Sequence, residues 1–558
     1  MNTLKKCSAF LLCVIMLFAC ACSDKTPSAG SDSTPPSDGI ASHPEVLSLF
    51  YCAKDSLNPY AASTEFNVKL QALMYDPLVR IDPSFQPEYV IAESIELLGK
   101  TCTVTLKSIA FSDGSVLTAD DVVYSLKLAK ESSLTYADQL SCVSGYKSEG
   151  GKVIITLTKA DPYFVNLLDF PIIKAHSESI TDENKIVLAP IGSGRYVFDR
   201  EKKCLNSNDS HILGAPTVKT IQLVDAPDSE VTKFNLEAGN VSLYTTDLSS
   251  GEMPSMIGTI SKAPLNNLIY LGVNLKRSTL ADVKMRYALS YAIDRAEICE
   301  NAYYSYALPA TGLFSPLWQD AKGLQNIPST DNLQNAIANL GELGYNSRDN
   351  EGFFIGNNGK RLSLTLICND GNSRRINAAS LIKAQIEALG IAVNVKTLSW
   401  DAYSAALSAG DFDLYIAEVK LLNNMDVTEL VTSEGSLSYG IPDKVTEPTA
   451  APSTTSPDSD PNKDAADIAP STALAIDDTA ADGSAAVPNI NDGLDNSVAG
   501  FYGEQLSLID IINAFNAEMP IIPICYRSGI TVYDASLNAE NMSSVSDAYY
   551  NLANIKLK

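Results

Sequence analysis

The sequence predicts an α/β protein with two or three domains, and three observations support this class. The chain has 558 residues, which is enough for more than one hydrophobic core. Segments that alternate with the strand period of two occur together with segments of helical period. Between residues 377 and 395 a helix, a glycine and an apolar strand follow one another, as in α/β units.

These elements follow from local patterns along the chain. A capping-box pattern at 118–121 predicts a helix start, and apolar residues follow it at helical spacing. Gly390 ends the helix that is predicted before it. Half-buried strands are predicted over 101–106 and 153–158, a buried strand over 391–395, and helices over 282–301, 377–389 and 506–515.

The N-terminus resembles an export signal. Lys5 and Lys6 precede an apolar run over 8–19, which is shorter than the about 20 residues that span a bilayer. The run ends at Cys20 and Cys22 in a pattern similar to a lipobox, in which a cysteine is acylated and becomes the new N-terminus. We expect a signal peptide over 1–22 and a lipid anchor at Cys20 or Cys22. The alternative is an ordinary cleaved signal with incidental cysteines.

Two segments have the composition of disordered chain. Residues 23–45 are rich in Ser, Pro, Gly and Asp, which predicts a flexible tether. Residues 442–491 are rich in Asp, Ala and Pro without aromatics, which predicts a disordered acidic insertion at a surface loop of a domain. A linker to a separate C-terminal domain is the alternative, but about 65 residues are few for an independent core.

Composition excludes several functions. The net charge of −25 argues against nucleic-acid binding, which uses clustered Lys and Arg. Three isolated histidines and no CxxC spacing argue against a metal site or a cofactor. Of eleven cysteines, four lie in the leader, and the other seven are scattered singly as expected of buried thiols. GxSxG, HExxH, Walker A and GxGxxG patterns are absent, so we do not expect an enzyme.

Four stretches in order resemble bacterial extracellular solute-binding proteins of family 5, which include oligopeptide-, dipeptide- and nickel-binding lipoproteins. The opening over 56–60 and 73–82 is similar to that of the family. So are FSDGSVLTADDVVYS at 111–125, PIGSGRY at 190–196 (with Ser193 and Arg195 as departures), and the helix over 283–298.

The resemblance implies a two-lobed periplasmic-binding-protein-like fold (type II, cluster C) with an extra subdomain. A ligand would be enclosed in the cleft between the lobes and delivered to an ABC permease by a monomer anchored outside the cytoplasm. Peptide is the expected solute. The alternatives are a non-peptide solute such as a sugar, or a surface sensor or adhesin. The expected boundaries are 46–262 for the first lobe, 66–186 for its subdomain, 263–520 for the second lobe and 521–558 for the return to the first.

The resemblance also implies ligand-binding residues, each with an ordinary structural alternative. Trp400 matches a cleft tryptophan of the family, and Tyr270 and Tyr526 match cleft aromatics, although all three could be plain packing residues. Arg374 and Arg375 resemble an arginine that clamps a peptide carboxylate, or they start a solvated helix. Arg527 could pair with a carboxylate or lie at the surface.

One departure concerns the peptide amine. Peptide-binding members place an Asp where this chain has Leu422 or Asn423, and the preceding Trp is missing. Glu418 or Asp426 could replace that carboxylate, and Lys420 could neutralise it or attract an anion. The alternative for all three is a solvated loop.

Overall fold

The computed structural model describes residues 47–133, 135–181, 183, 187–329, 333–442, 493–538 and 542–557. The predicted signal peptide, the tether and the lipid-anchor candidates Cys20 and Cys22 lie outside the described residues. The predicted insertion does so too, apart from Pro442. The described residues belong to one compact unit that spans 44–558. None of the helices in these ranges is long and apolar enough to cross a bilayer.

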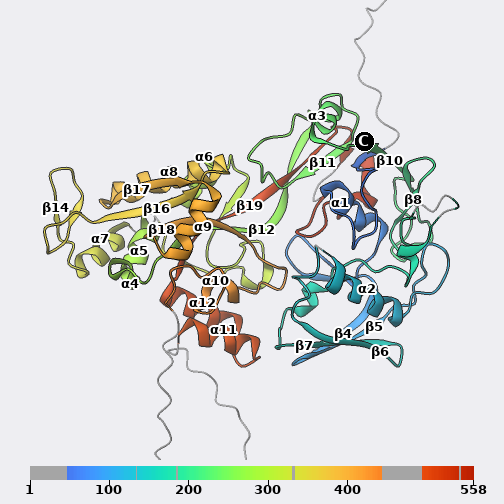
Figure 1. The fold of residues 1–558 in the computed structure, drawn as a ribbon, viewed down its shortest axis with the longest axis horizontal. Coiled ribbons are helices and arrows are strands. Elements are labelled where there is room, and N and C mark those ends of the chain that lie inside the picture. The colour runs from blue at the N-terminus through green and yellow to red at the C-terminus, as the bar shows by residue number, and fades with distance from the viewer. Residues whose placement is uncertain are drawn as a thin grey trace, which may run out of the picture. The chain divides into compact units, whose positions relative to one another are not determined.

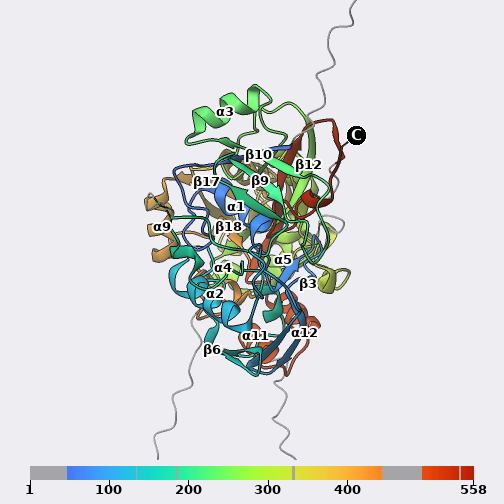
Figure 2. The ribbon, with the colours of Figure 1, turned by 90° about the vertical axis from the view of Figure 1, so that its right-hand side faces the viewer.

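Two four-stranded sheets form from the first half of the chain. In the N-terminal sheet, β1 (Leu47–Tyr51) pairs in parallel with β10 (Thr220–Asp225), and β9 and β8 follow as antiparallel strands. The second sheet, the subdomain sheet, is antiparallel with the order β4-β5-β7-β6, and α2 (Ala119–Ser132) packs on β6 and β7 (Figures 1 and 2). The Asp121 carboxylate accepts hydrogen bonds from the backbone and hydroxyl of Thr118, which confirms the predicted capping box.

The third sheet has seven strands and is organised by two long ones. β12 (Thr259–Val273) and β19 (Ile521–Tyr533) pair antiparallel along most of their length (Figure 1). One end of this pair carries β11 (Leu243–Thr246), and the other carries β18, β16 and β17. Strand β19 is therefore an internal strand of the sheet, and residues on both sides of the 442–491 segment belong to this one sheet.

Parallel strands and helices alternate at the second end of this sheet. β16 (Ser363–Asn369), α8 (Ser373–Leu389) and β17 (Ala392–Leu398) form a βαβ unit, and α9 (Trp400–Ala409) leads to β18 (Leu414–Lys420). Gly390 ends α8 with φ of 110°, a conformation that favours glycine. The α/β class is thereby confirmed.

Two predictions about this region were wrong in detail. Residues 282–301 form two helices, α5 (Val283–Ala292) and α6 (Arg295–Asn301), because Asp294 caps a new helix start by accepting the Glu297 N–H at 2.9 Å. The strand after Gly390 is not buried throughout. It is the edge strand β17, so side chains such as Val393 are buried while others face solvent.

The remaining elements complete the three sheets, smaller hairpins and their covering helices. The other strands are β2 (Val79–Ile81), β3 (Pro87–Tyr89), β4 (Ala92–Leu98), β5 (Thr101–Leu106), β6 (Val143–Glu149), β7 (Lys152–Leu157), β8 (Tyr196–Asp199), β9 (Cys204–Ser207), β13 (Ala307–Pro309), β14 (Ser347–Arg348), β15 (Phe354–Ile355), β20 (Leu537–Asn538) and β21 (Lys556–Leu557). The other helices are α1 (Glu65–Met74), α3 (Ser229–Glu237), α4 (Ser278–Ala281), α7 (Leu333–Glu342), α10 (Thr428–Val431), α11 (Leu494–Tyr502) and α12 (Leu508–Glu518).

The cysteines of the described residues carry no disulfide. All seven thiols are free, and all but Cys142 are fully buried, which confirms the expectation of buried thiols for those six. A core of this size does not need covalent staples, since burial of apolar surface grows with chain length.

Candidate binding site

A cavity of about 620 Å³ lies between the two long strands and the N-terminal elements. Its wall includes α1, the segment 245–249, the bulge of β12 at 263–265, the turn 420–423 after β18, and the C-terminal segment 543–550. The register of β12 against β19 shifts between Pro264 and Asn267, which turns this part of the strand toward the cavity. The volume is in the range of pockets that enclose small organic ligands.

The cavity wall combines aromatic rings with polar groups. Tyr75, Tyr136, Tyr549 and Tyr550 all line it, and Leu422 adds an apolar side chain from the turn after β18. Tyr75 is fixed by donating its hydroxyl hydrogen to the Leu57 carbonyl at 2.9 Å. A largely apolar wall with a few polar groups is the usual composition of a small-molecule site.

Asp76 and His211 form a buried pair on this wall. His211 Nε2 lies 2.9 Å from Asp76 Oδ2, and His211 Nδ1 accepts the Leu213 N–H at 3.1 Å. Nε2 is therefore the atom that carries the ring proton and donates it to Asp76. Ser193 donates a second hydrogen bond to the same carboxylate at 3.0 Å. The donors satisfy Asp76 within the protein, so this pair supports the wall.

The glycines of the 190–196 motif explain how Ser193 reaches Asp76. A Cβ atom on Gly192 would lie 2.2 Å from the Met74 carbonyl oxygen, and one on Gly194 would lie 2.3 Å from the Met74 carbonyl carbon. Only glycine permits this close approach to the end of α1. The motif therefore packs the chain against the cavity wall.

The carboxylate of Asp547 has few hydrogen-bond donors and no ion pair among the described residues. Its Oδ1 accepts the Tyr549 N–H at 2.7 Å, while its own N–H donates to the Ser544 hydroxyl at 3.2 Å. Burial raises the pKa of Asp547 to about 6, against the lowering effects of the Tyr549 hydrogen bond and the charge of Arg80. Arg80 itself is bound to Glu88 at 2.8 Å and to the Tyr550 carbonyl.

Asp169 is a second carboxylate on the wall, and it is well supplied with donors. Gln139 and Asn423 donate hydrogen bonds to its two oxygens, the latter at 2.9 Å. Burial nevertheless raises the pKa of Asp169. Since Asn423 belongs to the turn after β18, this hydrogen bond connects that turn to the segment that follows β7 of the subdomain sheet. Asn424 and Asp161 add a parallel contact at 2.7 Å.

Gln71 of α1 carries a buried polar atom without a protein partner. Its Oε1 accepts the Tyr136 hydroxyl hydrogen at 3.1 Å, and its Nε2 has no hydrogen bond among the described residues. The side chain lines the cavity and is 2% exposed. Whichever way the amide is turned, one of its two polar atoms stays unsatisfied, which is costly in a buried position.

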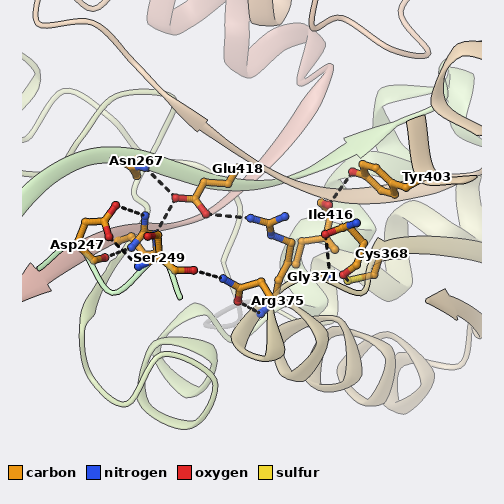
Figure 3. A network of polar contacts seen from close by, with 12 residues as sticks. Asp247, Ser249, Asn267, Cys368, Gly371, Arg375, Tyr403, Ile416 and Glu418 are labelled. Atoms are coloured by element: carbon orange, nitrogen blue, oxygen red, sulfur yellow. Dashed lines mark hydrogen bonds and ion pairs between the residues drawn. The ribbon is translucent and has the colours of Figure 1, made fainter. Parts of the chain in front are cut away.

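Glu418 lies in a network of arginines beside the cavity (Figure 3). Arg527 Nε binds its Oε1 at 2.7 Å, Arg375 Nη2 binds its Oε2 at 3.1 Å, and Asn267 donates to Oε1 at 2.8 Å. Burial alone would raise the pKa of Glu418, but Arg527, Asn267 and Arg375 together hold it below its ordinary value. Arg527 also donates to the Asp247 carbonyl, at the edge of the cavity.

The residues expected from the sequence fall into three groups. Lys420 is exposed, lines the cavity, and its ammonium has no partner among the described residues. Glu418, Arg375 and Arg527 form the network, and Arg374 donates to the Gly251 carbonyl at 3.2 Å beside it. The arginines are thus neither a solvated helix start nor a surface group, because Arg374 and Arg527 are buried.

The network residues lie outside the cavity lining, and so do the other expected residues. Tyr270 is buried in β12 against Tyr415, and Tyr526 is buried in β19, where its hydroxyl donates to the Leu313 carbonyl. Asp426 forms an ion pair with Lys159 at 3.0 Å and accepts the N–H of Thr428, the first residue of α10, at 2.9 Å. Trp400 starts α9 and is 65% exposed.

Sequence reasoning missed Gln71, Tyr136, Asp169 and Asp547. The run SSVSDAYY at 543–550 did carry a signal, since it gathers hydroxyl, carboxylate and aromatic groups in a segment without periodicity. Among the described residues, no group of three or more His, Cys, Asp or Glu side chains is placed to hold a metal ion.

Comparison with known proteins gives consistent matches. The model of the family "Bacterial extracellular solute-binding proteins, family 5 Middle" matches residues 86–426. The oligopeptide-binding protein AppA of Bacillus subtilis is 27% identical over 435 residues, which are 72% of this chain and 78% of AppA.

Solved structures show the same fold at low sequence identity. The structure of AppA from Bacillus subtilis with a nonapeptide has a TM-score of 0.52 at 20% identity, covering 92% of this chain and 97% of AppA. The unliganded open form of MppA, a periplasmic murein tripeptide binding protein, has a TM-score of 0.69 at 18% identity, covering 92% and 98%. These matches confirm the predicted two-lobed α/β fold.

Proposed function

The chain belongs to the bacterial extracellular solute-binding proteins of family 5, and on this basis we propose that it captures a peptide for an ABC importer. The observation that carries the proposal is the cavity, which is walled both by N-terminal elements and by the turn 420–423. The names of AppA and MppA describe peptide binding, which favours peptide as the solute class. The protein would act by binding and delivery, without chemical turnover.

Delivery would use the two lobes. The first lobe would comprise 46–262, with its subdomain over 66–186 and a return over 521–558, and the second lobe would comprise 263–520. A bound solute would hold the turn 420–423 against the first lobe and so present a changed surface to the permease. The paired side chains of Asn423 and Asp169 support this idea, because they join the two sides of the cavity at 2.9 Å.

The location of the protein is part of the same proposal. An extracellular solute-binding family fits a position outside the cytoplasm. We infer a monomer held to the membrane by a lipid on Cys20 or Cys22, after cleavage of the signal peptide. Cysteine-to-serine variants of the two positions, followed by membrane fractionation, test which residue carries the lipid.

A second candidate is an importer receptor for a non-peptide solute such as a sugar. Leu422 favours it, because this apolar side chain lies on the cavity wall where peptide-binding members of the family are expected to place an Asp. A sensor or adhesin with the same fold would bind its ligand without a cognate permease.

Ligand screening of residues 44–558 tests the proposal. A ligand at 100 times its Kd stabilises a folded protein by about 2.7 kcal/mol, which is visible as a rise in melting temperature. We expect a shift with short peptides and none with mono- or disaccharides. A shift with sugars alone would replace the peptide proposal by the second candidate. Native mass spectrometry of the purified protein checks for a ligand that is retained from the cell.

A further inference from the structure

The turn after β18 brings no carboxylate to the cavity. It contributes the cation Lys420, the apolar side chains of Leu421 and Leu422, and the amide of Asn423. A peptide carries an ammonium group at its N-terminus, and burying such a group without a counter-charge is strongly unfavourable. If the cavity holds a peptide, another wall must supply the negative charge.

The C-terminal segment supplies a carboxylate in a fixed position. The Asp547 side chain lines the cavity, and the hydrogen bonds to Tyr549 and Ser544 hold it in a tight turn. The residue is 9% exposed. Arg80, whose charge acts on Asp547, binds Glu88 at 2.8 Å and stacks on Tyr550 with 4.1 Å from its guanidinium carbon to the ring centre. Asp547 therefore has no direct ion pair within the described residues.

The unsatisfied amide of Gln71 is an independent sign of a ligand at this place. Gln71 contacts Tyr136 at 3.1 Å, and Asp169 and Asp547 line the same cavity as these two residues. A buried polar atom without a partner is rare unless a water or a ligand satisfies it. If the ammonium group of a ligand lies next to Asp547, a neighbouring carbonyl or amide group of the same ligand can form a hydrogen bond with Gln71.

Asp169 adds negative potential without competing for the same role. Gln139 and Asn423 already occupy both of its oxygens. Its charge reaches the cavity through space, which strengthens the attraction for a cation in a low-dielectric site. Carboxylates also outnumber Lys and Arg side chains on the cavity wall as a whole.

We propose that Asp547 binds the N-terminal ammonium group of a peptide, with Gln71 and Tyr136 bonding the adjoining backbone and Asp169 adding its charge. The inference rests on the proposed peptide function and specifies the contact that the turn 420–423 lacks. The anchoring charge comes from the C-terminal segment instead of the turn after β18. Lys420 then faces the ligand from the other wall.

Two peptide pools test this assignment directly. A synthetic pool of di-, tri- and tetrapeptides with free N-termini is compared with the same pool after N-acetylation, which removes the positive charge. Each pool is dialysed against residues 44–558 at pH 7.5, and the retained peptides are measured by mass spectrometry. The proteins are the natural sequence, Asp547→Asn and the control Asp138→Asn. Asp138 lines the same cavity but is exposed, so its variant removes a negative charge outside the proposed contact.

We expect the natural protein to retain the free pool at least about tenfold better than the acetylated pool, since a buried charge pair is lost. Asp547→Asn should abolish this preference, and Asp138→Asn should keep it. A melting temperature of Asp547→Asn at or above that of the natural protein shows that the loss is not unfolding. Equal retention of both pools by the natural protein, or an unchanged preference in Asp547→Asn, overturns the anchor while peptide binding stands. Retention of neither pool overturns the peptide function itself, and the anchor with it.

Discussion

Asp547 lies on the cavity wall and Glu418 lies in the arginine network beside the cavity, and the two carboxylates differ in how they are paired. Glu418 receives two arginines and an asparagine at 2.7 to 3.1 Å, which lower its pKa in spite of burial. Asp547 receives one backbone N–H, and burial raises its pKa to about 6. The charge of Glu418 is neutralised by arginines of the protein, whereas the charge of Asp547 has no ion-pair partner among the described residues.

This contrast separates a structural role from a binding role. Glu418 joins β18 to β19 through Arg527 and to α8 through Arg375, so its charge is used to hold elements together. A group that is kept ionisable, buried and poorly paired on a cavity wall costs stability without a folding benefit. Such a cost is expected where a ligand supplies the missing partner.

The largest effect is expected from Glu418→Gln. The substitution keeps the size of the side chain but removes the charged partner of Arg527, which is 5% exposed and keeps only the distant Asp247 carboxylate at 3.9 Å as a counter-charge among the described residues. Removing one partner of a buried ion pair typically lowers the stability of a protein by about 3 to 5 kcal/mol. We expect a loss of about 3 to 5 kcal/mol in the free energy of unfolding, measured by urea denaturation at pH 7.

Glu149→Gln is the matched control for this prediction. Glu149 pairs with Lys147 at 2.7 Å, but both side chains are more than 60% exposed. Solvent-exposed pairs contribute little, so no resolvable change in the urea midpoint is expected. If Glu418→Gln is as mild as this control, the network is not structural and Glu418 returns as a candidate ligand residue.

The second largest effect is expected from Asp547→Asn, and it has the opposite sign at neutral pH. A carboxyl group whose pKa is raised on folding makes the folded protein less stable as the pH rises from the pKa of the unfolded state to that of the folded state, here from about 4 to about 6. That gap corresponds to about 3 kcal/mol at about 1.4 kcal/mol per pH unit. The variant lacks this loss, so we expect it to be more stable than the natural protein at pH 7 in the absence of ligand.

The pH profile of unfolding checks the assignment. The difference in unfolding free energy between Asp547→Asn and the natural protein should grow from pH 4 to pH 6 and then stay level. The charged and titratable groups around Asp547 are Arg80, Tyr136, Asp169, Tyr549 and Tyr550, and the Asn variant leaves all of them unchanged. A variant that is less stable at pH 7 would mean that Asp547 holds the fold together, as Glu418 does.

The sequence predicted the fold far better than the site. The capping box at Thr118 depends on local geometry, which neighbouring residues determine. The α/β class followed from periodicity for the same reason. The helix break at Asp294 was missed because one capping carboxylate overrides a continuous apolar pattern.

The site depends on contacts between distant segments, which periodicity does not reveal. Gln71 and Tyr136 are 65 positions apart, and Asp169 and Asn423 are 254 apart. Residues such as Glu418 and Arg527 looked suited to a ligand because their types suit one. The structure places them opposite each other across β12, where they serve as each other's partners. Residue type alone cannot separate these two cases.

A smaller effect is expected from Lys420→Gln. Lys420 is an exposed cation on the wall formed by the turn, so it can attract a ligand carboxylate only through partly screened charge. An exposed ion pair is worth about 0.2 to 1 kcal/mol, which corresponds to a change in Kd of up to about fivefold. Peptide binding measured at low and high salt should show a salt dependence that the variant loses. Lys262→Gln on β12, whose side chain is exposed and does not line the cavity, should bind like the natural protein.

The smallest effect is expected from Trp400→Ala. The resemblance to the family implied a ligand contact for Trp400, yet its ring is 65% exposed at the start of α9, where it lies near Tyr403 and apart from the cavity wall. Because the side chain is mostly in water, its removal should change the Kd for peptides less than about twofold and leave the melting temperature nearly unchanged. Titration of a peptide from the free pool into both proteins measures this. A roughly tenfold weaker affinity of the variant for the peptide would mean that Trp400 closes over the bound ligand. The contrast between the paired Glu418 and the unpaired Asp547 would then describe only one end of a longer site.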